Sequence, residues 1–160
     1  MPQRFGECDV AVTDREIERL IYRSCRCLDE EDFGGYLDLC APEFHYRITA
    51  HSPEIRKEMI WLDHDRKGLE ALFENLPSHL RRPGRLFRHA SVYDVTIEGV
   101  RASAETSLVV LVTGFDGKTA VLAAGRYEDT IELEGEAPLL LSRTVRLETR
   151  DLGIGSHVPI

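Results

Sequence analysis

The sequence predicts an α+β fold in which a strongly curved antiparallel sheet wraps around N-terminal helices. Two observations support this. The first is a run of four strand-like segments after residue 84, each with apolar residues at every second position. The second is the order of the elements before that run, which is helix, helix, strand and helix. A sheet with one apolar face needs a layer packed on it, and the helices supply that layer.

Alternation assigns one face of each of the four segments to the core. Residues that tolerate positive φ separate the segments, at Glu98-Gly99, at 114–117 and at 134–136. We therefore predict an antiparallel meander. The predicted inward residues are Tyr93, Val95 and Ile97, then Ala102, Ala104, Leu108, Val110 and Val112, then Val121, Ala123, Tyr127, Ile131 and Leu133, and finally Leu139, Leu141, Val145 and Leu147.

The first helix is predicted from Asp14 to Glu30. Thr13 and Glu16 form the pattern of a capping box at its start. Apolar residues at helical spacing follow the capping box. We expect residues 1–12 to form an N-terminal arm and residues 13–160 to form a single domain.

A second, short helix is predicted after Asp32, carrying residues up to Cys40 and ending at Ala41-Pro42. Alternating aromatic and β-branched residues then predict a strand over 44–49. The stretch 54–61 is charged and has no clear period.

A third helix is expected from Asp65, as its cap, through Leu76. Pro77 ends it.

Composition excludes several classes of protein. The chain has 160 residues and a formal net charge of −8, which argues against a general binder of nucleic-acid phosphates. No segment resembles a signal peptide or a membrane span, so we expect a cytoplasmic protein. Cys8, Cys25, Cys27 and Cys40 lack the spacing of a disulfide framework and are expected to be free thiols.

Four segments together carry a resemblance to a known family: 88–95 (RHASVYDV), 125–130 (GRYEDT), 142–148 (SRTVRLE) and 152–160 (LGIGSHVPI). Over residues 14–160 the chain resembles the small, or β, subunits of Rieske-type ring-hydroxylating oxygenases (aromatic dioxygenases). Asp94 stands where that family usually has Asn. The segment 60–67 (IWLDHDRK) is also similar to the small subunit of methanesulfonate monooxygenase.

The resemblance implies a cone-shaped fold, like those of nuclear transport factor 2 and scytalone dehydratase. It implies a non-catalytic, structural β subunit that forms a trimer under three large α subunits (α3β3). The Rieske [2Fe-2S] cluster and the mononuclear iron would lie in the large subunit. The complex would hydroxylate an aromatic or small organic substrate, including a sulfonated one, as in aromatic hydrocarbon catabolism.

Metal ligands are not predicted in this chain. A Rieske cluster needs C-x-H and C-x-x-H spacing, and no cysteine here has a histidine two or three residues after it. A non-haem iron site needs two histidines and a carboxylate that converge. His45, His51 and the cluster 63–65 are the candidates. Surface charge at the start of a helix explains the cluster better than a metal site does.

The alternative is a stand-alone isomerase or dehydratase of the same fold that acts on a small carbonyl compound. His45, Asp63 or His89 would be the base, and Tyr22 would be the hydrogen-bond donor. Their spacing does not show that these side chains converge. A ligand-binding module is a third option.

The resemblance also favours a set of interface residues. Basic residues precede the sheet and could bind an acidic partner surface. The only Trp could either plug the cone mouth or anchor a subunit contact. The closing segment is expected to dock on a neighbouring subunit. The predicted interface residues are Trp61, Arg81, Arg82, Arg85, Arg88 and His157.

Overall fold

The computed structural model describes residues 11–78, 83–154 and 158–160, and it confirms the predicted α+β fold. The helices are α1 (Asp14–Asp29), α2 (Phe33–Asp38) and α3 (Arg66–Asn75), and a short 3-10 helix, Leu76–Ser78, follows α3. The strands are β1 (Cys40–Ser52), β2 (Lys57–Asp65), β3 (Arg85–Glu98), β4 (Arg101–Thr113), β5 (Thr119–Glu132) and β6 (Leu139–Leu147).

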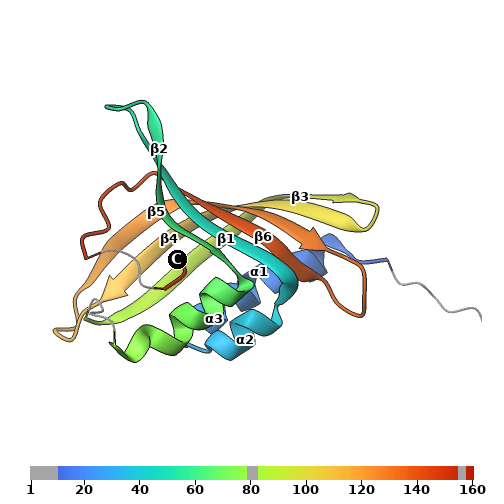
Figure 1. Cartoon of the computed structure of the whole chain (residues 1–160), viewed down its shortest axis with the longest axis horizontal. Coiled ribbons are helices and arrows are strands. Elements are labelled where there is room, and N and C mark those ends of the chain that lie inside the picture. Colours follow the sequence, from blue (N-terminus) through green and yellow to red (C-terminus); the bar gives the residue numbers. More distant parts are fainter. Residues whose placement is uncertain (1–10, 79–82, 155–157) are drawn as a thin grey trace, which may run out of the picture.

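The strands form one curved sheet in the order β2-β1-β6-β5-β4-β3, and the helices lie together on one side of it (Figure 1). The meander from β3 to β6 is antiparallel, as predicted. The pair β1 and β6 is parallel, so the sheet as a whole is mixed. The helix layer buries the concave face, which confirms the expected wrapping of the sheet around the helices. None of the described helices combines the length and apolarity that crossing a membrane requires.

Local caps set the helix boundaries. At the start of α1 the Glu16 carboxylate accepts hydrogen bonds from the Thr13 main-chain N–H at 2.8 Å and from the Thr13 hydroxyl at 3.0 Å, which confirms the capping interaction. Asp32 accepts from the N–H of Gly35 at 2.9 Å, and Asp65 accepts from that of Gly68 at 2.8 Å. The predicted starts of all three helices are therefore correct.

Two segments before the meander differ from the prediction. Helix α2 ends at Asp38, and β1 already begins at Cys40, so Pro42 lies within an irregular part of the strand. The charged stretch 54–61 contributes to β2, which pairs with β1 as an edge strand. Strand β2 has no continuous buried face, and this is why alternation does not reveal it.

Bulges change which residues of the meander face inward. In β3 the register shifts between Val92 and Asp94, so Tyr93 is exposed although it was expected in the core. In β6 the register with β5 shifts around Leu141, so Leu140 is buried in place of its predicted neighbours. Val121 is exposed because the β4–β5 register shifts beside it. Strand β4 follows the predicted alternation throughout its buried part.

Gly125 allows β5 and β6 to approach closely. A methyl group at this position would lie 2.2 Å from the main-chain oxygen of Arg146 and 2.9 Å from the Cα of Leu147. We expect Gly125→Ala to lower the free energy of unfolding by about 3 kcal/mol, because main-chain atoms cannot move aside without opening the strand pair. Urea unfolding of the purified variant measures this loss.

Gly34→Ala is the matched control. Gly34 lies in α2, and an added methyl there meets only a carboxylate oxygen of Asp32 at 4.0 Å. We expect this variant to be unchanged or more stable by up to about 1 kcal/mol. Equal stability of the two variants would contradict the close approach at Gly125.

Candidate functional site

A charged pair lies inside the sheet. The Arg143 guanidinium donates from Nε and a terminal nitrogen to the two carboxylate oxygens of Asp129, at 2.7 Å each. Its other terminal nitrogen donates to the Ser24 hydroxyl of α1 at 2.9 Å. The guanidinium also lies 3.9 Å from the ring centroid of Tyr127. Neither charged side chain has exposed surface, so water cannot solvate either charge.

Burial alone would lower the pKa of Arg143, but the charge and hydrogen bonds of Asp129 outweigh that effect and raise the pKa well above its ordinary value. The guanidinium therefore remains charged. Its hydrogen bonds in the structure go to Asp129 and Ser24. This arrangement connects β5, β6 and α1.

The segment Val158–Ile160 returns into the same space, which we call the cone interior and define by Tyr46, Tyr127, Asp129 and Arg143. The Tyr127 hydroxyl donates to the main-chain oxygen of Ile160 at 2.7 Å, and the Tyr46 hydroxyl lies 3.2 Å from that oxygen. The Ile160 N–H donates to the Tyr46 hydroxyl at 2.7 Å. The closing segment thus packs inside its own chain, and the prediction that it docks on a neighbour is wrong for Val158–Ile160.

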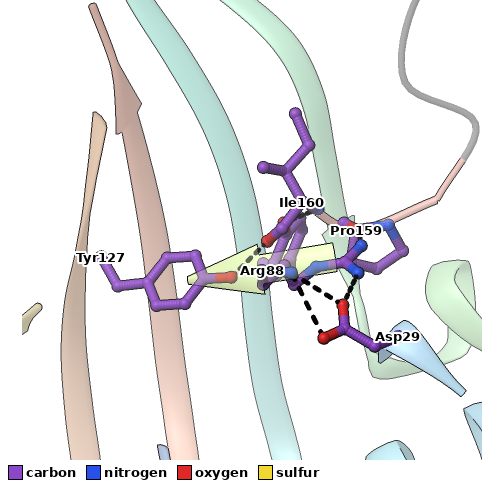
Figure 2. Close-up of polar contacts among 6 residues, drawn as sticks. Asp29, Arg88, Tyr127, Pro159 and Ile160 are labelled. Atoms are coloured by element: carbon purple, nitrogen blue, oxygen red, sulfur yellow. Dashed lines mark hydrogen bonds and ion pairs between the residues drawn. The ribbon is translucent and has the colours of Figure 1, made fainter. Parts of the chain in front are cut away.

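Arg88 connects this segment to α1, as Figure 2 shows. One terminal nitrogen of Arg88 lies 2.6 Å from the Asp29 carboxylate, and the other donates to the Pro159 carbonyl at 2.7 Å. The Arg88 main-chain N–H also donates to Asp29 at 3.1 Å. The side chain of Arg88 is fully buried, because its partner Asp29 lies on the helix that covers β3. Its predicted interface role stays a prediction.

The remaining buried polar groups do not form a catalytic set. Burial raises the pKa of Tyr46, of Tyr127 and of Tyr36, so these phenols stay protonated at neutral pH. The hydroxyls of Tyr36 and Thr106 are buried, and neither has a hydrogen-bond partner among the described residues. A general base needs an accessible lone pair beside a substrate, and neutral phenols enclosed in this way do not provide one.

The four candidates for an isomerase or dehydratase site do not come together in one place, although two of them form a pair at the edge of the sheet. His45 lies 2.7 Å from Asp63, and both are partly exposed, on β1 and the edge strand β2. Tyr22 is exposed on α1, where its hydroxyl accepts from the Val92 N–H at 3.3 Å. His89 is exposed on β3. These four residues therefore lie outside the cone interior.

Among the described residues, no group of three or more His, Cys, Asp or Glu side chains is placed to hold a metal ion. Cys25, Cys27 and Cys40 are free thiols. Burial raises the pKa of Cys25 and raises that of Cys40 to about 12, which opposes the thiolate form that metals bind.

Of the other predicted interface residues, Arg85 is exposed at the start of β3. Trp61 is partly buried against the core, and its indole nitrogen is buried without a hydrogen-bond partner among the described residues, which favours the core role. Arg81, Arg82 and His157 lie outside the described residues. Their interface role stays a prediction.

The outer face of the sheet carries an apolar area, which we call the β3–β5 apolar surface and define by Phe87, Val109, Leu111, Phe115 and Val121. Phe87 pairs with Leu111, and Leu111 pairs with Val121, so three strands contribute to one row. Phe87 is 55% exposed, Val121 is 64% exposed and Phe115, in the β4–β5 turn, is 91% exposed. Exposed apolar side chains gathered in this way mark interaction sites.

Ion pairs cover a different part of the same face. Arg146 of β6 contacts Glu128 and Glu58 at 2.7 Å each, and Arg126 contacts Glu105 at 3.5 Å. Exposed pairs of this kind contribute little to stability. They do keep this part of the face polar, so the apolar area is confined to the β3–β5 end.

The sequence analysis did not predict that residues of the cone interior form a buried polar group. Asp129 lies between Tyr127 and Ile131 on the predicted inward face of β5, and Arg143 precedes Val145 on that of β6. A charged residue at an inward position on each of two neighbouring strands is a signal for a buried ion pair.

These features define a cone-shaped α+β protein with a closed interior. The family model of the SnoaL-like domain matches residues 10–143. The chain is 36% identical over 145 residues to the beta subunit of 2-aminobenzenesulfonate 2,3-dioxygenase from an Alcaligenes species, covering 90% of this chain and 97% of the relative. It is 38% identical over 154 residues to the hydroxylase beta subunit of methanesulfonate monooxygenase from Methylosulfonomonas methylovora, covering 90% and 85%.

A solved structure shares the fold. It is the beta subunit of a protein assigned as an aromatic-ring-hydroxylating dioxygenase from Novosphingobium aromaticivorans, with a TM-score of 0.78, 23% identity and coverage of 91% of this chain and 95% of that chain. The chain therefore belongs to the SnoaL-like domain family and, within it, to the beta subunits of multicomponent ring-hydroxylating and sulfonate oxygenases. This supports the oxygenase-subunit interpretation over the stand-alone isomerase or dehydratase.

Arg143→Met tests the buried pair. This substitution leaves the Asp129 carboxylate buried without its counter-charge, so we expect the free energy of unfolding to fall by about 3–5 kcal/mol. Urea unfolding measures the loss. The double variant Arg143→Met with Asp129→Leu removes both charges and should lose less than the single variant. A single variant within about 1 kcal/mol of the parent would contradict the assignment.

The pH dependence of stability tests the burial of Cys40. Its pKa rises from 9.0 to about 12 on folding. Below pH 9 the thiol is protonated in both states, whereas between pH 9 and 12 only the unfolded chain releases the proton. The free energy of unfolding should therefore fall by about 1.4 kcal/mol per pH unit from this group in that range.

The measurement is urea unfolding under reducing conditions at several pH values from 8 to 11. Cys40→Ala provides the comparison, because it lacks the titrating thiol and retains the other groups. We expect a shallower decline for the variant above pH 9. Parallel curves for the two proteins would refute the raised pKa.

Proposed function

We propose that this chain is the structural β subunit of a multicomponent Rieske non-haem iron oxygenase and that the catalytic centres lie in a large α subunit. The observation that carries the proposal is the closed cone interior. Pro159 and Ile160 occupy it, and Arg143 is fully paired with Asp129. Among the described residues, Arg143, Tyr46 and Tyr127 already bind other groups of the same chain, so the chain would contribute to the complex through its outer surface.

The substrate of the complex is an organic sulfonate. This part of the proposal rests on the two curated relatives, whose names specify an aromatic sulfonate, 2-aminobenzenesulfonate, and an aliphatic one, methanesulfonate. They share the sulfonate group and differ in the carbon skeleton. The large subunit would recognise the sulfonate and would hold the Rieske cluster and the mononuclear iron, in the cytoplasm.

Assembly would use the β3–β5 apolar surface together with Arg85. The β subunits would associate as a trimer that orders three large subunits. Phe87 and Val121 are the exposed members of a row that extends across three strands, and burying them removes apolar area from water. Aromatic and Arg side chains are frequent at the energetic centres of interfaces.

Purification of the tagged chain from its native cells tests the subunit role. We expect a larger chain to co-purify and to show the visible absorption of an iron–sulfur cluster. Phe87→Glu combined with Val121→Glu should weaken assembly at least about 10-fold, because two charges would enter an apolar contact. Size-exclusion chromatography of the reconstituted complex measures this change.

Val100→Glu is the control, since Val100 is 53% exposed at the opposite end of the β3–β4 hairpin. It introduces one glutamate, where the test variant introduces two, at an exposure similar to that of Phe87, and it should leave assembly intact. A colourless chain that purifies without a partner would refute the subunit role. An intact complex from the double variant would refute only the assigned surface.

A further inference from the structure

We propose that the hairpin formed by β1 and β2 is the arm through which this chain binds the large subunit, at an acidic groove that contains an apolar pocket. The inference rests on the proposed function, since it names the surface that this partner would contact. The hairpin arm, which we define as residues 51–58, projects from the body of the molecule (Figure 1). The β3–β5 apolar surface extends to the opposite end of the strand order, so the two surfaces can contact different neighbours.

The hairpin arm is a two-stranded extension of the sheet. The pairing of β1 with β6 ends at Ala50, whereas its pairing with β2 continues as far as Ser52 and Lys57. A two-stranded hairpin without a third strand is only marginally stable in water. The arm therefore depends on side chains from elsewhere in the chain to keep its shape.

Two arginines hold the arm through its carboxylates. Arg146 of β6 lies 2.7 Å from Glu58, and Arg150 lies 2.5 Å from Glu54. Hydrogen bonds from Arg150 lower the pKa of Glu54 to about 2, so this carboxylate stays ionised at neutral pH. Both acidic groups of the arm are thus matched within the chain.

The basic groups of the arm have no such match. Arg56 and Lys57 are exposed, and neither has an ion-pair partner among the described residues. The tip therefore presents two positive charges in a chain whose formal net charge is −8, and such a tip attracts an acidic surface. Arg56 also has a φ of 50°, where glycine is favoured, so an arginine occupies this position at a cost to the backbone.

Apolar side chains accompany these charges. Ile55, between the two strands of the arm, is 61% exposed, and Ile60, just beyond the arm on β2, is 58% exposed. A single exposed isoleucine is ordinary on a protein surface. One that stands beside two unmatched cations on a projecting arm can enter a pocket of a partner without any rearrangement of the sheet. The tip thus fits an apolar pocket with carboxylates around it.

The base of the arm favours the same kind of partner. A hollow of about 340 Å³ lies there, between residues of the arm and three arginines, which are Arg126, Arg146 and Arg150. Arg126 is loosely paired, since it lies 3.5 Å from Glu105 and 3.9 Å from Glu148. A carboxylate of the partner that enters the hollow can pair with Arg126 at a shorter distance. The acidic surface inferred from the tip would therefore continue to the base.

Reversal of both charges, Arg56→Glu with Lys57→Glu, tests the arm. Affinity for the large chain that co-purifies with the parent should fall at least about 10-fold, because two repulsive charges replace two attractive ones. Surface plasmon resonance with that purified chain measures the affinity. Size-exclusion chromatography of the small chain alone should show unchanged self-association, since the β3–β5 apolar surface is intact.

Arg15→Glu with Arg23→Glu is the matched control. Both arginines are exposed on α1, and the change in net charge is the same. This variant should bind the large chain as the parent does.

Arg56→Gly separates contact from folding. Glycine accepts the positive φ, so the melting temperature should stay within about 2 °C of that of the parent. Affinity for the large chain should still fall about 5-fold, because one cation of the tip is lost. A merely structural role of Arg56 predicts no loss of affinity at unchanged melting temperature.

A photo-crosslinking residue, p-benzoylphenylalanine, in place of Ile55 identifies the occupant in native cells. Irradiation should join this chain to the large chain, and mass spectrometry identifies the product. A product with a second copy of this chain, or no product, overturns the proposal. Parent affinity in the charge-reversed variant overturns the arm and leaves the subunit role standing. A parent that purifies without a large chain refutes the subunit role and, with it, this inference.

Discussion

The ion pair between Arg143 and Asp129 is the interaction on which the rest of the structure depends. The two residues are directly opposite each other in the β5–β6 ladder, and neither has exposed surface. A slip of one residue in that register would leave two buried charges without partners, which costs several kcal/mol. Because Arg143 also donates to Ser24 of α1, the same guanidinium fixes where the helix lies on the sheet. One pair therefore specifies both the strand register and the position of the covering helix.

The interior that this pair organises is polar and yet closed. The hydroxyls of Tyr46 and Tyr127 and one terminal nitrogen of Arg88 bind main-chain oxygens of the closing segment, and Asp29 balances the charge of Arg88. Raised pKa values keep Tyr46 and Tyr127 in the donor form. Both hydroxyls bind the main-chain oxygen of Ile160, and Arg88 binds that of Pro159, so these groups join the end of the described structure to β1, β3 and β5. These hydrogen bonds stabilise the fold.

The sequence was sufficient to predict elements that local interactions determine. It was insufficient where an element or a side chain's position depends on residues far away in the chain. Thr13 and Asp65 mark helix starts because their caps involve residues three positions away. Alternation predicts β4 because its buried face is regular. Tyr93 was misplaced because a bulge reverses the alternation. The contact between Arg88 and Asp29 was not predicted, because the two residues are 59 positions apart. The edge strand β2 lacks a continuous buried face, so its pattern contains no strand signal. Family resemblance predicted the subunit class, which spacing alone could not do.

The outer face of the sheet carries ion pairs and an exposed apolar row, and the packing of the cone interior does not explain them. Ion pairs around Arg146 keep the β5–β6 part of that face polar, whereas the row from Phe87 to Val121 remains apolar and exposed. An exposed apolar row costs solubility and contributes nothing to the stability of the isolated chain, since the core already lies on the opposite face of the same strands. The interior of the cone stabilises the chain itself, so the asymmetry of the outer face points to contacts at the β3–β5 end.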